Sequence, residues 1–174
     1  MKKTFEEKIT CLLVEKKCIT REEAIALCKD FSGRSSDESF DAFLINEGIV
    51  AREEMLKVLS EYYKVPSFDV IGYFFKPELL HLFTEEFLVH HTVIPLELGE
   101  MTMSLVAGTP DDEDLQREIA ELVSYDIQWY VGISNDIQDA LVDYYENSPF
   151  KEEASYDDDF GQDAYTLEDL DDIE

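Results

Sequence analysis

The first 63 residues contain the same helical unit twice, and this duplication restricts the folds available to the chain. At an offset of 31 residues Leu13 pairs with Leu44 and Ile19 with Val50, and an Arg-Glu-Glu tripeptide recurs at 21–23 and 52–54. In each copy apolar residues follow three- and four-residue spacing on both sides of a short interruption, which is typical of two amphipathic helices joined by a tight turn. The pattern predicts two helical hairpins that share one apolar core.

The turn and the helix start differ between the two copies. Gly48 lies where the chain must reverse, a place that favours a left-handed backbone. The first copy has Lys17 there, at an expected cost of about 1 kcal/mol if the geometry is kept. Thr20 and Glu23 are predicted to form a capping box, whereas the second copy has Ala51 at the cap position and loses about 1 kcal/mol.

After Pro66 the pattern changes to a mixture of helices and strands. We expect one or two helices over 77–91, the second capped by Thr84, and then a hairpin over 93–108 with a two-residue turn at Gly99 and Glu100. A helix over 110–124, a strand over 126–133 and a last helix over 134–148 complete the order. The predicted fold class is α+β: a duplicated helical subdomain (1–68), a small ααββαβα layer with a three-stranded sheet (69–148) and a disordered acidic tail (149–174).

Three details of this second region are testable. Pro95 confines the first strand to a sheet edge or a bulge, because proline cannot donate to the ladder. Asn135 and Gln138 are predicted to form a capping box for the last helix. The helix over 110–124 is expected to bury four apolar side chains, those of Leu115, Ile119, Leu122 and Val123.

Charge excludes some function classes. The net charge is −27, and residues 151–174 hold eleven of the 41 acidic residues but only one of the 14 basic ones, so the rest of the chain carries −17. Both parts repel phosphate backbones, which argues against nucleic acid as a partner. The tail lacks core formers, although an apolar stripe suited to a protein partner recurs in it: Tyr165, Leu167, Leu170 and Ile173.

No motif for catalysis is present. Cys11, Cys18 and Cys28 are odd in number and form no C-x-x-C, which favours reduced, buried thiols over a disulfide framework. Adjacent histidines such as His90 and His91 cannot share a metal on one helix. We therefore expect no enzyme activity, no metal and no cofactor. The chain has no apolar run of membrane-spanning or signal-peptide length, and we expect a cytoplasmic protein.

The doubled unit and the motifs after it resemble the N-terminal domain of the bacterial type II secretion and type IV pilus assembly ATPases, the MshEN domain. The ordered set covers about residues 8–146 and includes "YYKVP" with Asp69, "PELL" at 77–80, "VIPL" at 93–96, "LVA" at 105–107 with Pro110, and the pair Tyr144-Tyr145. These ATPases continue into a motor domain with a Walker A loop, which this sequence lacks.

In some members of this family the repeats bind cyclic di-GMP. The resemblance assigns ligand contacts to an R-L-G start, to the apolar positions that follow and to a closing Gln in each repeat. Here the starts read Lys8-Ile9-Thr10 and Ser39-Phe40-Asp41, and Phe31 and Tyr62 replace the glutamines. The degenerate ligand positions are Lys8, Ile9, Leu12, Leu13, Phe31, Ser39, Phe40, Phe43, Leu44, Gly48 and Tyr62.

These replacements favour a protein-interaction or regulatory module that no longer binds cyclic di-GMP, because an arginine fork is lost and Asp41 repels phosphate. By resemblance, its partner belongs to a secretion, pilus or motility machine. The alternative is a small-molecule regulator whose altered repeats hold cyclic di-GMP or another nucleotide.

Overall fold

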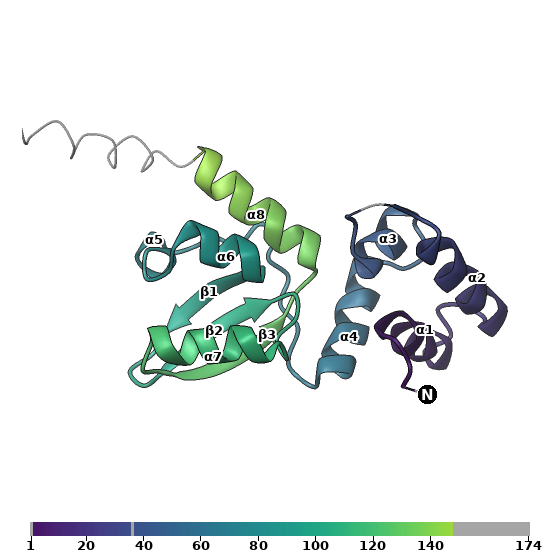
Figure 1. Cartoon of the computed structure of the whole chain (residues 1–174), viewed down its shortest axis with the longest axis horizontal. Coiled ribbons are helices and arrows are strands. Elements are labelled where there is room, and N and C mark those ends of the chain that lie inside the picture. The colour runs from purple at the N-terminus through teal and green to yellow at the C-terminus, as the bar shows by residue number, and fades with distance from the viewer. Residues whose placement is uncertain (1, 36, 148–174) are drawn as a thin grey trace, which may run out of the picture. The chain divides into compact units, whose positions relative to one another are not determined.

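The computed structural model describes residues 2–35 and 37–147. This part of the chain contains eight helices and three strands (Figure 1). They are α1 (Phe5–Glu15), α2 (Arg21–Ser32), α3 (Phe40–Asn46), α4 (Arg52–Tyr63), α5 (Pro77–Leu80), α6 (Glu85–His91), β1 (Val93–Leu98), β2 (Thr102–Ala107), α7 (Glu113–Leu122), β3 (Asp126–Val131) and α8 (Ser134–Asn147). The α+β class and the ααββαβα order are confirmed. Residues Met1–Leu141 form one compact unit, described below, and the predicted division after residue 68 stays a prediction. The tail prediction lies outside the described residues.

The two helical hairpins turn in the same way. Lys17 has a φ of 60° and Gly48 a φ of 70°, so both copies use the left-handed backbone that the sequence predicted. The Cys18 amide donates to the Leu13 carbonyl at 2.9 Å, and the equivalent Ile49 amide donates to Leu44 at 3.0 Å. The turn geometry is thus maintained although the first copy has lost its glycine.

Helix starts follow the predicted capping chemistry. The Thr20 amide donates to Glu23 Oε2 at 2.7 Å, and the Glu23 amide donates to Thr20 Oγ1 at 3.2 Å, which completes the capping box. Ala51 gives α4 no side-chain cap. Thr84 caps α6 by accepting from the Phe87 amide.

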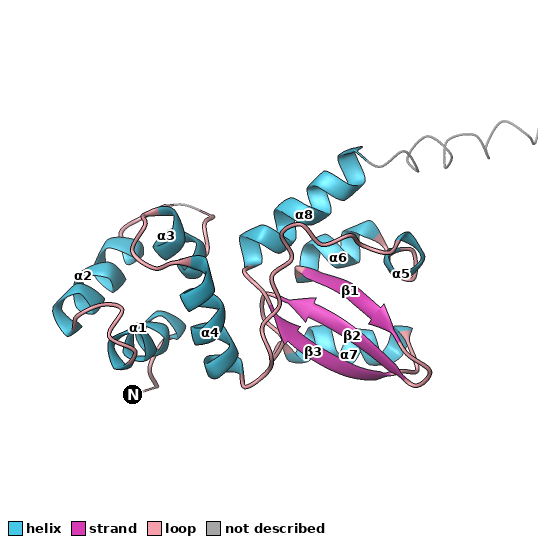
Figure 2. Ribbon diagram, turned by 180° about the vertical axis from the view of Figure 1, so that it is seen from behind, coloured by secondary structure: helices cyan, strands magenta, loops and turns pink. Residues whose placement is uncertain are grey.

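The three strands form a mixed sheet in the order β1-β2-β3. β1 pairs antiparallel with β2, and β2 pairs parallel with β3 after the α7 crossover. Figure 2 shows α7 behind the strands, so this helix covers one face of the sheet. β1 is an edge strand with an irregularity between Pro95 and Glu97, which confirms the predicted effect of the proline.

Three local predictions are wrong. In the hairpin the Gly99 amide donates to the Thr102 carbonyl at 2.7 Å, so Gly99 begins the turn and Glu100 and Met101 are its central residues. Of the four side chains predicted to be buried by α7, only Leu115 and Ile119 are buried, and Leu122 is 55 % exposed where the helix ends.

The predicted capping box of α8 is also wrong. The helix begins at Ser134, which places Asn135 inside its first turn. Its Oδ1 accepts a hydrogen bond of 3.4 Å from the Ser39 hydroxyl. The side-chain amide of Gln138 donates to Thr92 Oγ1 at 3.3 Å. Both side chains therefore serve contacts to distant segments rather than the start of their own helix.

The hydrophobic core joins the helical hairpins to the third strand. Val131 and Ile133 belong to the same buried cluster as Leu13, Leu44 and Met55. The backbone supports this junction, because the Phe68 amide donates to the Val131 carbonyl and the Val131 amide donates to Pro66, each at 2.9 Å. The segment after α4 thus adds a single parallel bridge to the free edge of β3.

Candidate functional site

The apolar ligand positions of both repeats face the core. Ile9, Leu13 and Leu44 are fully buried, and Phe40 and Phe43 are 2 % and 1 % exposed. Leu12 packs against the same cluster as a partly buried residue. The structure thus brings these positions of the two repeats together, and their side chains contact one another.

The aromatic residues that replace the closing glutamines pack across the repeats. Phe31, at the end of the first repeat, lies with its ring centroid 5.0 Å from Phe40 and 5.5 Å from Phe43, both at the start of the second. Tyr62, at the end of the second repeat, lies 5.2 Å from Phe5 at the start of the first. Each closing aromatic ring therefore packs against a ring at or near the start of the other repeat.

A cation lies over each aromatic group. Lys8 Nζ is 5.7 Å from the centroid of the Tyr62 ring, and Arg34 Cζ is 4.5 Å from that of Phe43. Arg34 lies in the segment between α2 and α3. Its guanidinium also contacts Glu47 Oε1 at 3.1 Å and Asp30 Oδ2 at 3.3 Å. These contacts engage the guanidinium with the protein itself.

The third position of each repeat start carries a buried polar residue. Thr10 is 3 % exposed and its hydroxyl donates to the Glu6 carbonyl at 2.8 Å. Asp41 is 4 % exposed. It stands at the position where the family motif has a glycine, which carries no charge to repel phosphate. Ser39 is half-buried and bonded to Asn135, whereas Lys8 is exposed. Of these four residues, only the exposed Lys8 keeps a property of the family motif, the positive charge of its arginine.

The electrostatics of this region disfavour additional negative charge. Burial, reinforced by the Asp111 and Tyr62 side chains and by Asp41, raises the pKa of the Tyr63 phenol above its usual value. The causes are loss of solvent and neighbouring negative charge, both of which penalise an anion. An added phosphate close to Tyr63 and Asp41 would meet the same penalties.

Arg52 is a residue that the sequence analysis missed. Its guanidinium lies 2.7 Å from Asp136 Oδ2 on α8 and 3.1 Å from Asp69 Oδ1 in the segment after α4. The hydrogen bond to Asp136 is the main cause that raises the pKa of Arg52. Its repeated Arg-Glu-Glu tripeptide was the available signal, but the acidic partners lie 17 and 84 residues away and could not be read from it.

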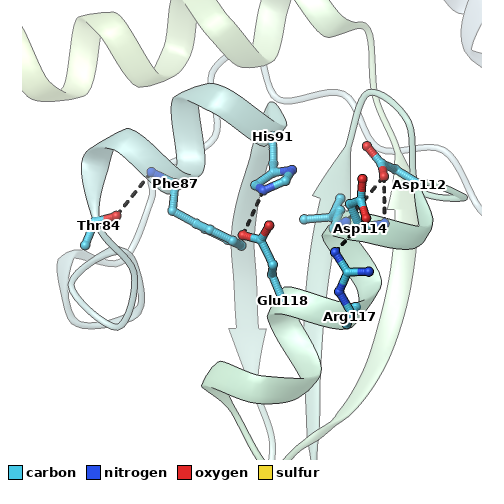
Figure 3. Close-up of polar contacts among 8 residues, drawn as sticks. Thr84, Phe87, His91, Asp112, Asp114, Arg117 and Glu118 are labelled. Carbon is cyan, nitrogen blue, oxygen red and sulfur yellow. Dashed lines mark hydrogen bonds and ion pairs between the residues drawn. The ribbon is translucent and has the colours of Figure 1, made fainter.

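A second polar cluster lies between α6 and α7. Figure 3 shows His91 pointing toward Glu118, with Nε2 and Oε2 3.1 Å apart. Asp112 caps α7 by accepting from the amides of Asp114 and Leu115, and Arg117 pairs with Asp114 at 2.7 Å. These contacts hold the two helices and the start of α7 in place. In the described ranges no group of three His, Cys, Asp or Glu side chains is placed to hold a metal ion.

Other sequence predictions have mixed outcomes. All three cysteines are free, as expected, but Cys11 is exposed, and Cys18 and Cys28 are only partly buried. The predicted partner residues Tyr165, Leu167, Leu170 and Ile173 lie outside the described part. No helix within that part has both the length and the apolar character needed to cross a bilayer.

Two solved structures share this fold. The structure of MshE with cdg (cyclic di-GMP) has a TM-score of 0.61 at 15 % identity and covers 79 % of this chain and 98 % of its own. The N-terminal domain of XpsE has a TM-score of 0.54 at 17 % identity and covers 81 % of this chain and 96 % of its own. Among curated proteins no sequence matches.

The family itself is identified by sequence. The pattern of the MshEN domain matches residues 63–150, from the end of α4 through α8. This region holds the sheet and the helices around it, whose order agrees with the sequence prediction. The chain belongs to the MshEN domain family.

Proposed function

We propose that this chain is a non-catalytic protein-interaction module of a secretion, pilus or motility machine. It acts in the cytoplasm, and the nucleotide positions of its repeats have become part of its packing. The partner that we propose is a cytoplasmic domain of the inner-membrane platform of such a machine. The acidic tail is proposed as a second contact for a basic surface of the partner, since charge of one sign raises association rates.

One observation carries the proposal. At both repeat starts, side chains expected to face a nucleotide contact the protein's own aromatic residues. Phe40 contacts Phe31, and the Lys8 ammonium lies over the Tyr62 ring. A ligand would have to displace these rings, at a cost of about 0.5–1.5 kcal/mol for each aromatic pair beyond the lost burial. Because the nucleotide positions of the repeats are filled by the protein's own side chains, we propose that the fold serves to bind another protein.

Direct titration tests the interaction. The full chain is titrated by calorimetry into the purified cytoplasmic domain of the platform protein from the same bacterium, with and without cyclic di-GMP. We expect binding that is unchanged by the nucleotide and that weakens as salt rises, because charge screening removes the contribution of the tail. Absence of binding at high micromolar concentrations would contradict the proposed partner.

The second candidate function is cyclic di-GMP binding by the altered repeats. Exposed Lys8 favours it, since an ammonium group attracts phosphate, and the related MshE structure contains cdg. Calorimetry with cyclic di-GMP distinguishes the two candidates. Micromolar binding that Lys8→Ala abolishes and Lys57→Ala preserves would favour the nucleotide, whereas our proposal predicts no measurable heat. Lys57 is a suitable control because it pairs with Glu54 on the exposed side of α4.

A further inference from the structure

A groove of about 780 Å³ lies between α1 and α2. Its apolar lining comes from Val14, Ala24 and Ile25, and Ile25 is 63 % exposed. Cys11 and Cys28 also line it. None of the degenerate ligand positions of the repeats lines this groove, although Thr10, the third residue of the first repeat start, does. The groove therefore borders the site described above and is lined mainly by other residues.

Three cations line the same groove. They are Lys3, Arg21 and Lys29, and no ion pair joins any of them to a carboxylate within residues 2–35 and 37–147. Glu7 and Glu15 also line the groove, which leaves a local excess of one positive charge. Lys3 Nζ donates to Cys11 Sγ at 3.4 Å. An apolar floor beside cations that pair with no carboxylate contrasts with the net charge of −27 of the chain.

The second repeat shows what the same face looks like when it is covered. At the offset of 31 residues Ile25 corresponds to Leu56, which is only 8 % exposed, and exposed Cys11 corresponds to Ala42, which is 3 % exposed. Leu56 belongs to the same buried cluster as Val131 and Ile133, whereas Ile25 lies outside that cluster. In the described part of the chain, Ile25 on the equivalent surface of the first repeat remains 63 % exposed.

The contacts of the second repeat also indicate which kind of segment packs on this surface. Arg21 corresponds to Arg52, which pairs with Asp136 and Asp69. The segment over the second repeat therefore combines apolar side chains with a following carboxylate: Val131, Ile133 and then Asp136. By the quasi-symmetry of the two hairpins, the groove suits a segment that offers apolar residues beside acidic ones.

We propose that the groove between α1 and α2 binds the acidic C-terminal segment 165–173 of this chain. That segment reads "YTLEDLDDI" and places Leu167, Leu170 and Ile173 among four acidic residues. The apolar residues would lie on Ile25 and its neighbours, and a carboxylate would reach Arg21. This inference does not rest on the proposed function, because it concerns the isolated chain.

The net charge of the chain does not rule out this contact. Charges farther away than about 8–10 Å are largely screened at physiological ionic strength, so Lys3, Arg21 and Lys29 outweigh the distant acids. Surface ion pairs contribute little individually, typically below about 1 kcal/mol. The apolar contacts must therefore supply most of the affinity, and both components need to be tested.

Alkylation of Cys11 tests the proposal on the full chain. The rate of reaction with a maleimide is followed by peptide mass spectrometry in wild type and in Leu167→Ser/Leu170→Ser/Ile173→Ser. We expect Cys11 to react at least about threefold faster in the triple variant, since a bound segment shields a thiol in proportion to its occupancy. Cys18, which does not line the groove, should react at the same rate in both.

Matched variants separate the two components. Tyr156→Ser/Phe160→Ser changes the tail outside the segment and should leave the Cys11 rate unchanged. Arg21→Glu should accelerate Cys11, whereas Arg117→Glu on α7 should not, and moderate salt should accelerate Cys11 only in the wild type. Equal Cys11 rates in wild type and the triple variant would overturn the proposal. Protection that grows with protein concentration would overturn a contact within one chain and assign the segment to a second copy.

Discussion

Single residues differ widely in how much they contribute to the fold, and the phenylalanines give the clearest contrast. Phe43 is 1 % exposed at the centre of the aromatic contacts between the repeats, whereas Phe74, in the segment between α4 and α5, is 92 % exposed. Both are large and apolar, so composition alone assigns them the same role. Their energetic roles are set by the neighbours that the fold gives them.

Replacing the two phenylalanines tests this contrast. Phe43→Ala should lower the free energy of unfolding by about 3–5 kcal/mol, because it removes buried surface and leaves a cavity. Phe74→Ala should change it by no more than about 0.5 kcal/mol, as expected for an exposed side chain. Urea unfolding of both variants measures the difference. Similar losses in the two would contradict the burial of the aromatic cluster.

Tyr63 predicts how stability responds to alkaline pH. Burial raises the pKa of its phenol in the folded state, while the unfolded chain keeps the ordinary value of about 10. Above about pH 10 the unfolded state therefore binds fewer protons than the folded state, and stability falls as pH rises, whereas below pH 10 this contribution is fully present. Urea unfolding at pH 8 and pH 11 should show a smaller loss for Tyr63→Phe than for wild type.

Tyr125→Phe provides the control for the alkaline experiment. Tyr125 is 36 % exposed just before β3, so the same loss of a hydroxyl occurs there with better access to water. A decline with pH that Tyr125→Phe reduces as much as Tyr63→Phe would contradict the assignment to Tyr63.

At the scale of elements, the two helical hairpins solve one turn with two different residues. The turns at Lys17 and Gly48 have nearly the same φ and equivalent backbone hydrogen bonds. Lysine pays the steric cost of a left-handed backbone that glycine avoids. The turn conformation is therefore determined by the hairpin as a whole. The residue at the turn changes only the free energy of adopting that conformation.

Exchanging the turn residues should shift stability in opposite directions. Lys17→Gly should raise the free energy of unfolding by up to about 1 kcal/mol, and Gly48→Ala should lower it by about the same amount. A methyl group at Gly48 would meet no atom within 4 Å, so the expected loss comes from the backbone alone. Thermal and urea unfolding measure both, and a loss in Lys17→Gly would contradict the backbone argument.

Helices, turns and strands were predictable from the sequence where they depend on residues that are close together in the chain. The hairpins, the Thr20 and Thr84 caps, and the edge position of Pro95 depend on residues close together in the chain, and all are confirmed. The capping prediction for Asn135 is wrong because α8 begins at Ser134, and the Asn135 side chain instead accepts from the Ser39 hydroxyl, 96 positions away. Long-range partners of this kind leave no spacing that a single sequence reveals.

The candidate site was predictable in part for the same reason. The residue types at the repeat starts show that the family's polar motif has changed, and the apolar periodicity places Leu13 and Leu44 in one core. The crossing of Phe31 onto the second repeat, and the cation over Phe43, required coordinates because they depend on how two helices meet.

At the scale of the whole compact unit, the buried cluster of the helical hairpins includes two residues at the end of the sheet. Val131 and Ile133 pack in the cluster of the repeats, and Arg52 links α4 to Asp136. The predicted boundary after residue 68 stays a prediction, and these contacts cross it. We expect the two regions to unfold together.

The single tryptophan allows a direct test. Trp129 lies in β3, so its fluorescence reports the sheet, whereas circular dichroism at 222 nm is dominated by the helices. Urea transitions followed by the two signals should coincide within error. Separate midpoints would instead support two domains that fold independently.

The irregular edge strand limits the ways in which another chain can bind. Pro95 offers no amide hydrogen, and the carbonyl of Leu96, displaced at the irregularity, accepts the Tyr73 hydroxyl at 3.0 Å. An incoming peptide would thus find neither a regular row of donors nor a free row of acceptors along β1. Recognition by strand addition is disfavoured at this edge, and the sheet is protected from self-association into extended ribbons.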